Sequence, residues 1–159
     1  MLCVRDPKDA LVSQFFSWAE SHTVEFEELS QLRSKLASVS VEDGIFKLIS
    51  GDHFIFGRQI RNWIDVLDSA HIVRYERLVS NFDCEIASVM NHMGLEFDEK
   101  LIGEMAEQYS FKNLAKKAKS NHYRKGVAGD WVNHFTPEIS EAFNRVYGDA
   151  CDLLNYSKA

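Results

Sequence analysis

Residues 4–16 read VRDPKDALVSQFF, which indicates the end of an apolar strand, a charged turn and the start of a helix. Residues 2–4 are apolar, and we expect them to close a short buried strand. Asp6 and Pro7 suit a helix start, because Asp caps unpaired backbone N–H groups and Pro tolerates the first helical position. The apolar spacing that follows predicts a helix over residues 8–22.

A second strand is expected at residues 70–76, which read AHIVRYE and contain a β-branched run. A last helix should begin with Thr136 as its cap and Pro137 at its first position. Apolar spacing predicts further helices at residues 24–37, 44–50, 52–67, 82–93, 99–108 and 111–118, with loops at residues 38–43 and 119–133.

Two short strands, each followed by a helix, predict an α/β fold that is mostly helical and keeps only a remnant of a parallel sheet. Two isolated strands are too few for a stable sheet, and parallel strands need crossover helices and cover on both faces. With 45% hydrophobic residues the chain has material for one core. We therefore expect residues 1–159 to form a single, partial domain of a larger α/β protein.

The composition argues against several classes of protein. A formal net charge of -6 argues against general nucleic-acid binding, so an anion site must come from local basic residues. The three cysteines have no metal-ligand spacing, which indicates buried thiols in a reducing compartment. No apolar run approaches the ~18 residues of a membrane span, and the apolar start is too short for a signal peptide. A cytoplasmic location is expected.

Two strand ends carry residues that suit phosphate or nucleotide binding. Arg5 stands where the first strand ends, and Ser13 lies two helical turns later. A guanidinium binds phosphate through two N–H groups, and a hydroxyl adds one bond. Tyr75 stands at the end of the second strand, where α/β sheets bind their ligands, and its ring suits a nucleotide base. The alternatives are a capping turn with a surface arginine and a solvated serine, and an amphipathic core tyrosine.

A third segment, residues 123–136, reads YRKGVAGDWVNHFT. Arg124 and Lys125 place two cations beside Gly126, a residue type that lets backbone N–H groups approach an anion. Trp131 would anchor the segment by burial. The alternative is a basic surface loop.

Taken together, these segments resemble the cytosolic-type sulfotransferases, which transfer a sulfuryl group from 3′-phosphoadenosine 5′-phosphosulfate (PAPS) to a hydroxyl or amine. The opening stretch resembles the family's 3′-phosphate-binding strand and helix, YERL at residues 75–78 its adenine-contacting motif, and RKGVAGDWVNHFT its C-terminal signature. Residues 110–114 resemble the segment that packs on the other side of the adenine. By this resemblance the donor-binding residues are Arg5, Ser13, Tyr75, Ser110, Phe111, Leu114, Arg124, Lys125 and Gly126.

The resemblance implies a partial P-loop-NTPase-like sulfotransferase fold, a PAPS-dependent enzyme without a metal, and a small-molecule acceptor. It identifies the chain as the C-terminal portion of the family's domain, because no GxxxxGK-like phosphate loop occurs in the sequence. At the family's dimer motif Thr136 and Glu141 remain, whereas Val132 and Pro137 replace a lysine and a valine, so a homodimer stays open. No catalytic residue is assigned, because none of the histidines matches the family's base: His22, His53, His71, His92, His122 and His134.

Three functions stay open from the sequence. In the first, the chain is the C-terminal portion of a sulfotransferase, as a truncated chain or gene fragment that is inactive alone. In the second, it is a catalytically inactive nucleotide-binding remnant or half of a split enzyme. In the third, it is a helical interaction module with accidental motif matches. Phenols, alcohols, amines and lipids all stay open as acceptors.

Overall fold

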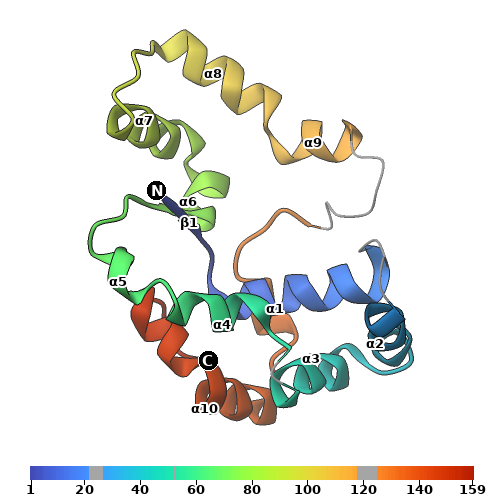
Figure 1. The fold of residues 1–159 in the computed structure, drawn as a ribbon. Coiled ribbons are helices and arrows are strands. Elements are labelled where there is room, and N and C mark those ends of the chain that lie inside the picture. Colours follow the sequence, from blue (N-terminus) through green and yellow to red (C-terminus); the bar gives the residue numbers. More distant parts are fainter. Residues whose placement is uncertain (22–26, 52, 118–124) are drawn as a thin grey trace. The chain divides into compact units, whose positions relative to one another are not determined.

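The computed structural model describes residues 1–21, 27–51, 53–117 and 125–159 of the chain (Figure 1). These residues form two compact units, and each is described by itself. Unit 1 comprises Met1–Arg5 and Leu67–Ala128, and unit 2 comprises Asp6–Val66 and Gly129–Ala159.

Unit 1 contains the sheet. Strand β1 (Leu2–Val4) pairs in parallel with β2 (Ile72–Arg74), so that Leu2 lies opposite Ile72 and Val4 opposite Arg74. This pair confirms the prediction of a mostly helical α/β chain with a remnant of a parallel sheet. The second strand is shorter than the expected residues 70–76, because a helix begins at Tyr75.

The helices of unit 1 follow β2 in chain order. They are α6 (Tyr75–Ser80), α7 (Phe82–His92), α8 (Glu99–Gln108) and α9 (Phe111–Lys117). The last three lie where apolar spacing predicts them, and Asp98 caps α8 by accepting the N–H of Leu101 at 2.8 Å. The sequence does not predict α6, because its six residues are too few to show a helical period.

Unit 2 holds the main hydrophobic core, around α1 (Pro7–Phe16). Asp6 caps this helix as predicted, since its carboxylate accepts the N–H of Lys8 at 2.9 Å. A π-helical turn, Ser17–Ser21, continues α1. The core packs α1 against α3 and α10 through side chains that are all buried: Leu11, Val12, Phe15, Ile45, Leu48, Phe143 and Tyr147. Figure 1 shows α1 among α3, α4 and α10.

The helices between residues 27 and 67 differ from the sequence expectation at two places. After α2 (Glu27–Ala37), helix α3 (Val41–Ser50) begins inside the expected loop, because the Ser40 hydroxyl accepts the N–H of Asp43 at 3.0 Å and caps it. The single helix expected over residues 52–67 is two helices, α4 (Ile55–Arg61) and α5 (Ile64–Leu67). The first one ends where Asn62 and Trp63 donate N–H to carbonyls three residues back, which tightens the last turn.

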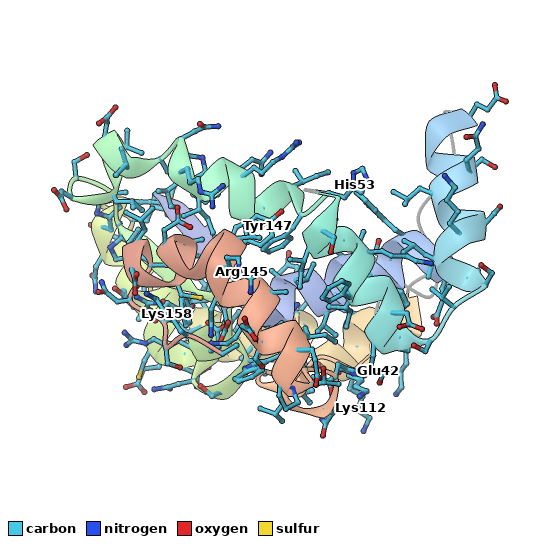
Figure 2. All side chains as sticks on the ribbon, turned by 90° about the horizontal axis from the view of Figure 1, so that it is seen from below. Glu42, His53, Lys112, Arg145, Tyr147 and Lys158 are labelled. Carbon is cyan, nitrogen blue, oxygen red and sulfur yellow. The ribbon has the colours of Figure 1, made fainter. Side chains whose placement is uncertain are left out.

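The last helix, α10 (Pro137–Leu153), begins as predicted with Thr136 accepting the N–H of Ile139. Its Tyr147 points toward α4 (Figure 2), where its ring meets that of Phe54 edge-on at 5.1 Å. Part of the loop expected before it is a 3-10 helix, Asp130–Asn133, because Asp130 accepts a hydrogen bond from Asn133 and binds His134 within one turn. Within the described part of the chain, no helix is both long and apolar enough to cross a membrane.

Candidate functional site

Arg5 and Tyr75 meet at one end of the sheet in unit 1. Each follows the last residue of its strand, and the two last residues, Val4 and Arg74, lie opposite each other. Because the two strands are parallel, Arg5 and Tyr75 both lie at the carboxyl end of the sheet. The Arg5 guanidinium carbon lies 4.4 Å from the centre of the Tyr75 ring, within the range of a cation–π contact.

The basic segment after residue 124 reaches the same strand end. Arg5 donates a hydrogen bond from Nη2 to the carbonyl of Val127 at 3.5 Å. Lys125 is exposed, and Gly126 has φ of +63°, a left-handed conformation in which glycine carries no strain. The structure therefore places Arg5, Tyr75 and the Lys125–Gly126 segment in one unit. Arg124 lies outside the described residues.

The other expected adenine-binding residues lie at the start of α9. Ser110 immediately precedes the helix and accepts the N–H of Asn113 at 3.4 Å, while Leu114 is half-buried one turn later. Phe111 is the first residue of α9. All of them belong to unit 1, together with Tyr75. Ser13 belongs to unit 2, where it is exposed on α1 between the buried residues Val12 and Phe15.

In unit 2, two buried side chains of α1 hold the GDW part of the signature segment. The Asp9 carboxylate accepts the N–H of Gly129 at 2.6 Å and that of Trp131 at 2.9 Å. Lys8 is buried with its ammonium 4.6 Å from the Trp131 ring centre, 3.4 Å from Asp6 Oδ2, and donating to the Ser157 carbonyl. A burial this complete is rare for lysine and needs such partners.

Sequence reasoning missed three residues that hold these segments: Lys8, Asp9 and Glu85. Glu85 is buried at the start of α7, where it accepts the N–H of Arg74 at 3.1 Å and pairs with Arg77 Nε at 3.0 Å. In the sequence an acidic residue in a first helical turn indicates only a favourable interaction with the helix dipole. The one signal for Lys8 and Asp9 is that two charges occupy adjacent positions beside apolar residues.

Three histidine side chains, those of His71, His92 and His134, contact neighbouring rings or a carboxylate. His134 Nε2 lies 3.3 Å from Asp130 Oδ2 and its ring meets Phe16 edge-on. The rings of His71 and His92 stack at 4.5 Å. His22 and His122 lie outside the described residues, and within the described part no group of three or more His, Cys, Asp or Glu side chains is placed to hold a metal ion.

The residues of the altered dimer motif lie around the start of α10. Val132 is 61% exposed on the 3-10 turn, whereas Pro137 is the first residue of α10. Glu141 pairs with Arg145 one turn later in the same helix, at 2.6 Å. The exposed Glu141–Arg145 pair is therefore an ordinary surface contact within one helix.

The fold matches that of a known sulfotransferase structure. A crystal structure of mouse sulfotransferase SULT7A1 complexed with PAP superposes with a TM-score of 0.68 at 18% identity, over 98% of this chain and 61% of that one. This likeness defines the fold class as that of a sulfotransferase.

The family follows from the sequence comparison. A family model described as Sulfotransferase domain matches residues 1–155, so the chain belongs to the sulfotransferase domain family. Relatives include 3-alpha-hydroxysteroid sulfotransferase of Cavia porcellus, 25% identical over 91% of this chain and 53% of its own length. Sulfotransferase 1C2 of Homo sapiens is 29% identical over 55% of this chain and 36% of its own length. The chain thus spans about half the length of the Cavia porcellus relative.

Proposed function

We propose that this chain carries the 3′-phosphate- and adenine-binding part of a PAPS-dependent sulfotransferase, and that residues 1–159 belong to a single domain of that enzyme. The observation that carries the proposal is the meeting of Arg5 and Tyr75 at the carboxyl end of two parallel strands. Arginine suits a phosphate and tyrosine suits a base, so one strand end offers partners for both parts of an adenosine 3′-phosphate.

The Lys125–Gly126 segment adds to this proposal. Lys125 supplies a second cation. Gly126 has a left-handed backbone and no side chain, so a phosphate can approach the backbone at this position. The Arg5 bond to the Val127 carbonyl ties the segment to the strand end. In the proposal Arg5, Ser13, Arg124, Lys125 and Gly126 hold the 3′-phosphate, and Tyr75, Ser110, Phe111 and Leu114 line the adenine.

The proposed reaction is an in-line transfer to a hydroxyl or amine of a small molecule. The acceptor oxygen or nitrogen bonds to sulfur as the bond between sulfur and the donor's phosphate oxygen breaks, and a base takes the acceptor's proton. The residues assigned here bind and orient the donor and balance its negative charge. None of them is assigned as the base.

The experiment is calorimetric titration of the chain with adenosine 3′,5′-bisphosphate, with 5′-AMP as the nucleotide control. We expect binding that requires the 3′-phosphate, because Arg5 and Lys125 act on that group. Lys125→Ala should weaken it by about tenfold, the size of one charged hydrogen bond, whereas Lys100→Ala, on the exposed face of α8, should leave it unchanged.

The outcomes separate the functions that stay open. Equal affinity for both nucleotides would contradict a 3′-phosphate site. Binding of the bisphosphate without sulfuryl transfer from labelled PAPS to phenol, alcohol or amine acceptors would favour the inactive nucleotide-binding protein or the half of a split enzyme. Absence of any nucleotide binding by the folded chain would contradict the proposed function and leave a member of the family without a working nucleotide site.

A further inference from the structure

We propose that Glu85 is a positioning residue that fixes Tyr75, and through its ring Arg5, at the end of the sheet. The proposal rests on the function proposed above, in which these two residues hold the donor nucleotide. Every contact that carries it lies within unit 1.

Glu85 brackets Tyr75 from both sides. Its Oε1 accepts the N–H of Arg74, the residue before Tyr75, at 3.1 Å, and its Oε2 lies 3.0 Å from Nε of Arg77, two residues after it. The glutamate is 3% exposed, whereas the Arg77 side chain is 62% exposed. The carboxylate is thus the fixed partner: it holds the backbone just before the tyrosine and pairs with a side chain just after it.

The start of α6 depends on this contact. The helix has six residues, and its N-cap residue, Arg74, makes no side-chain cap bond. A helix of this length is not stable by itself in water. Glu85 from α7 therefore supplies a bond from outside the helix to the turn from β2 into α6. A bond to a charged acceptor is stronger than one to a neutral group.

The position of Tyr75 follows from that turn. The Tyr75 ring can take only the few directions that staggered rotamers allow from its backbone, so a shift of the backbone also shifts the ring. The ring lies beneath the Arg5 guanidinium at 4.4 Å, and Arg5 also donates to the Val127 carbonyl. Loosening the turn at Arg74 would therefore move the ring away from the cation.

Glu85 also lies close enough to β1 to affect a thiol there. Partial burial raises the pKa of Cys3, and the negative charges of Glu76 and Glu85 raise that pKa further. Cys3 lies on β1 two residues before Arg5 and opposite Val73.

The test compares two variants of nearly equal size. Glu85→Met fills the space but accepts no hydrogen bond, whereas Glu85→Gln keeps an oxygen for the Arg74 N–H. The readout is the NMR shift of the Arg5 side-chain protons, which the Tyr75 ring displaces upfield; Tyr75→Leu gives the reference without a ring. We expect Glu85→Met to move the shift to the Tyr75→Leu value and Glu85→Gln to keep it.

A purely structural role for Glu85 predicts a different result. It would lower stability in Glu85→Met while leaving the Arg5 shift of the folded protein unchanged, and that result would overturn the proposal. Glu99→Met, an exposed glutamate in the first turn of α8, is the matched control and should leave the shift unchanged.

A measurement on the wild-type protein applies even if Glu85→Met does not fold. The Arg74 amide should exchange with deuterium at least about tenfold more slowly than exposed amides, because its N–H is bonded to a buried acceptor. Exchange at the rate of exposed amides would overturn the proposal.

Nucleotide binding separates this inference from the proposed function. If the wild-type chain binds adenosine 3′,5′-bisphosphate, Glu85→Met should bind it about tenfold more weakly than Glu85→Gln at equal folded fraction, and equal affinities would overturn the positioning role. If the wild-type chain binds no nucleotide, the proposed function fails, while the Arg5 shift and the Arg74 exchange still decide whether Glu85 positions Tyr75 and Arg5.

Discussion

The carboxylate of Asp9 accepts a hydrogen bond of 2.9 Å from the backbone N–H of Trp131, a residue 122 positions later in the chain. Its other oxygen accepts the N–H of Gly129, and the neighbouring Lys8 places its ammonium over the Trp131 ring. Two adjacent residues of α1 therefore hold both the backbone and the side chain of the GDW turn within unit 2. Such a contact joins segments far apart in sequence and fixes the start of α10 relative to α1.

We expect Asp9→Ala to lower the free energy of unfolding by about 2 kcal/mol, because two backbone N–H groups lose the charged acceptor that a buried carboxylate provides. Urea denaturation followed by circular dichroism measures this change. The matched control is Asp43→Asn, an exposed carboxylate in the first turn of α3, which should change stability by less than about 0.5 kcal/mol. Similar losses in the two variants would contradict the role of Asp9.

Local rules predicted the elements that depend on neighbouring residues. The caps at Asp6 and Thr136 are visible in the sequence because each cap and its helix are adjacent, and both are confirmed. The same rules placed the helix after residue 38 too late because the Ser40 cap was not recognised. They joined α4 and α5 because apolar spacing continues through Asn62 and Trp63, where the last turn tightens.

The sequence proposes candidate site residues only where they form a motif. Arg5, Tyr75 and Lys125 stand in recognisable segments, and the structure brings them into one unit. Asp9 and Glu85 accept hydrogen bonds from backbone N–H groups. Every residue except proline has such a group, so the sequence gives no sign of which N–H a carboxylate will bind.

We expect Gly44→Ala to destabilise the protein by about 2 kcal/mol, because a Cβ at this position would lie 2.1 Å from Cε2 of Phe15, a buried ring that cannot move aside. Gly103→Ala, in the middle of α8 with open space around the new methyl, should instead stabilise its helix by about 0.5–1 kcal/mol. Thermal denaturation measures both changes. Unchanged stability in Gly44→Ala would contradict the tight packing of α1 on α3.

A bidentate ion pair between Arg61 and Asp149 joins α4 to α10. We expect its contribution to the free energy of unfolding to vanish in acid. Arg61 Nε and Nη2 donate to the two oxygens of Asp149 at 2.7 and 3.0 Å, and these bonds lower the pKa of Asp149. Since the folded-state pKa is depressed, the pair stabilises the protein above the unfolded pKa of about 4 and loses this effect as the pH falls through the folded value. Because the side chains are 39% and 52% exposed, the contribution at neutral pH should be only about 0.5–1 kcal/mol.

The measurement for this pair is the difference in unfolding free energy between wild type and Asp149→Asn, taken from pH 7 to pH 3. The difference should shrink toward zero at the acid end. Glu141→Gln, which removes one partner of an exposed pair within α10, is the control and should change stability by no more than about 0.5 kcal/mol at either pH. A difference between wild type and Asp149→Asn that stays constant with pH would contradict a contribution from the charge of Asp149.

The three thiols should react with a disulfide reagent at three different rates at pH 8. Burial raises the pKa of Cys151 to about 11, so only about one molecule in a thousand carries its thiolate at this pH. Cys84 is exposed and should react first, while Cys3 should follow more slowly because partial burial and nearby glutamates raise its pKa. Cys151 should react only after unfolding in urea. Cys84→Ser should remove the fastest phase. A third thiol reacting in the folded protein would contradict the burial of Cys151 on α10.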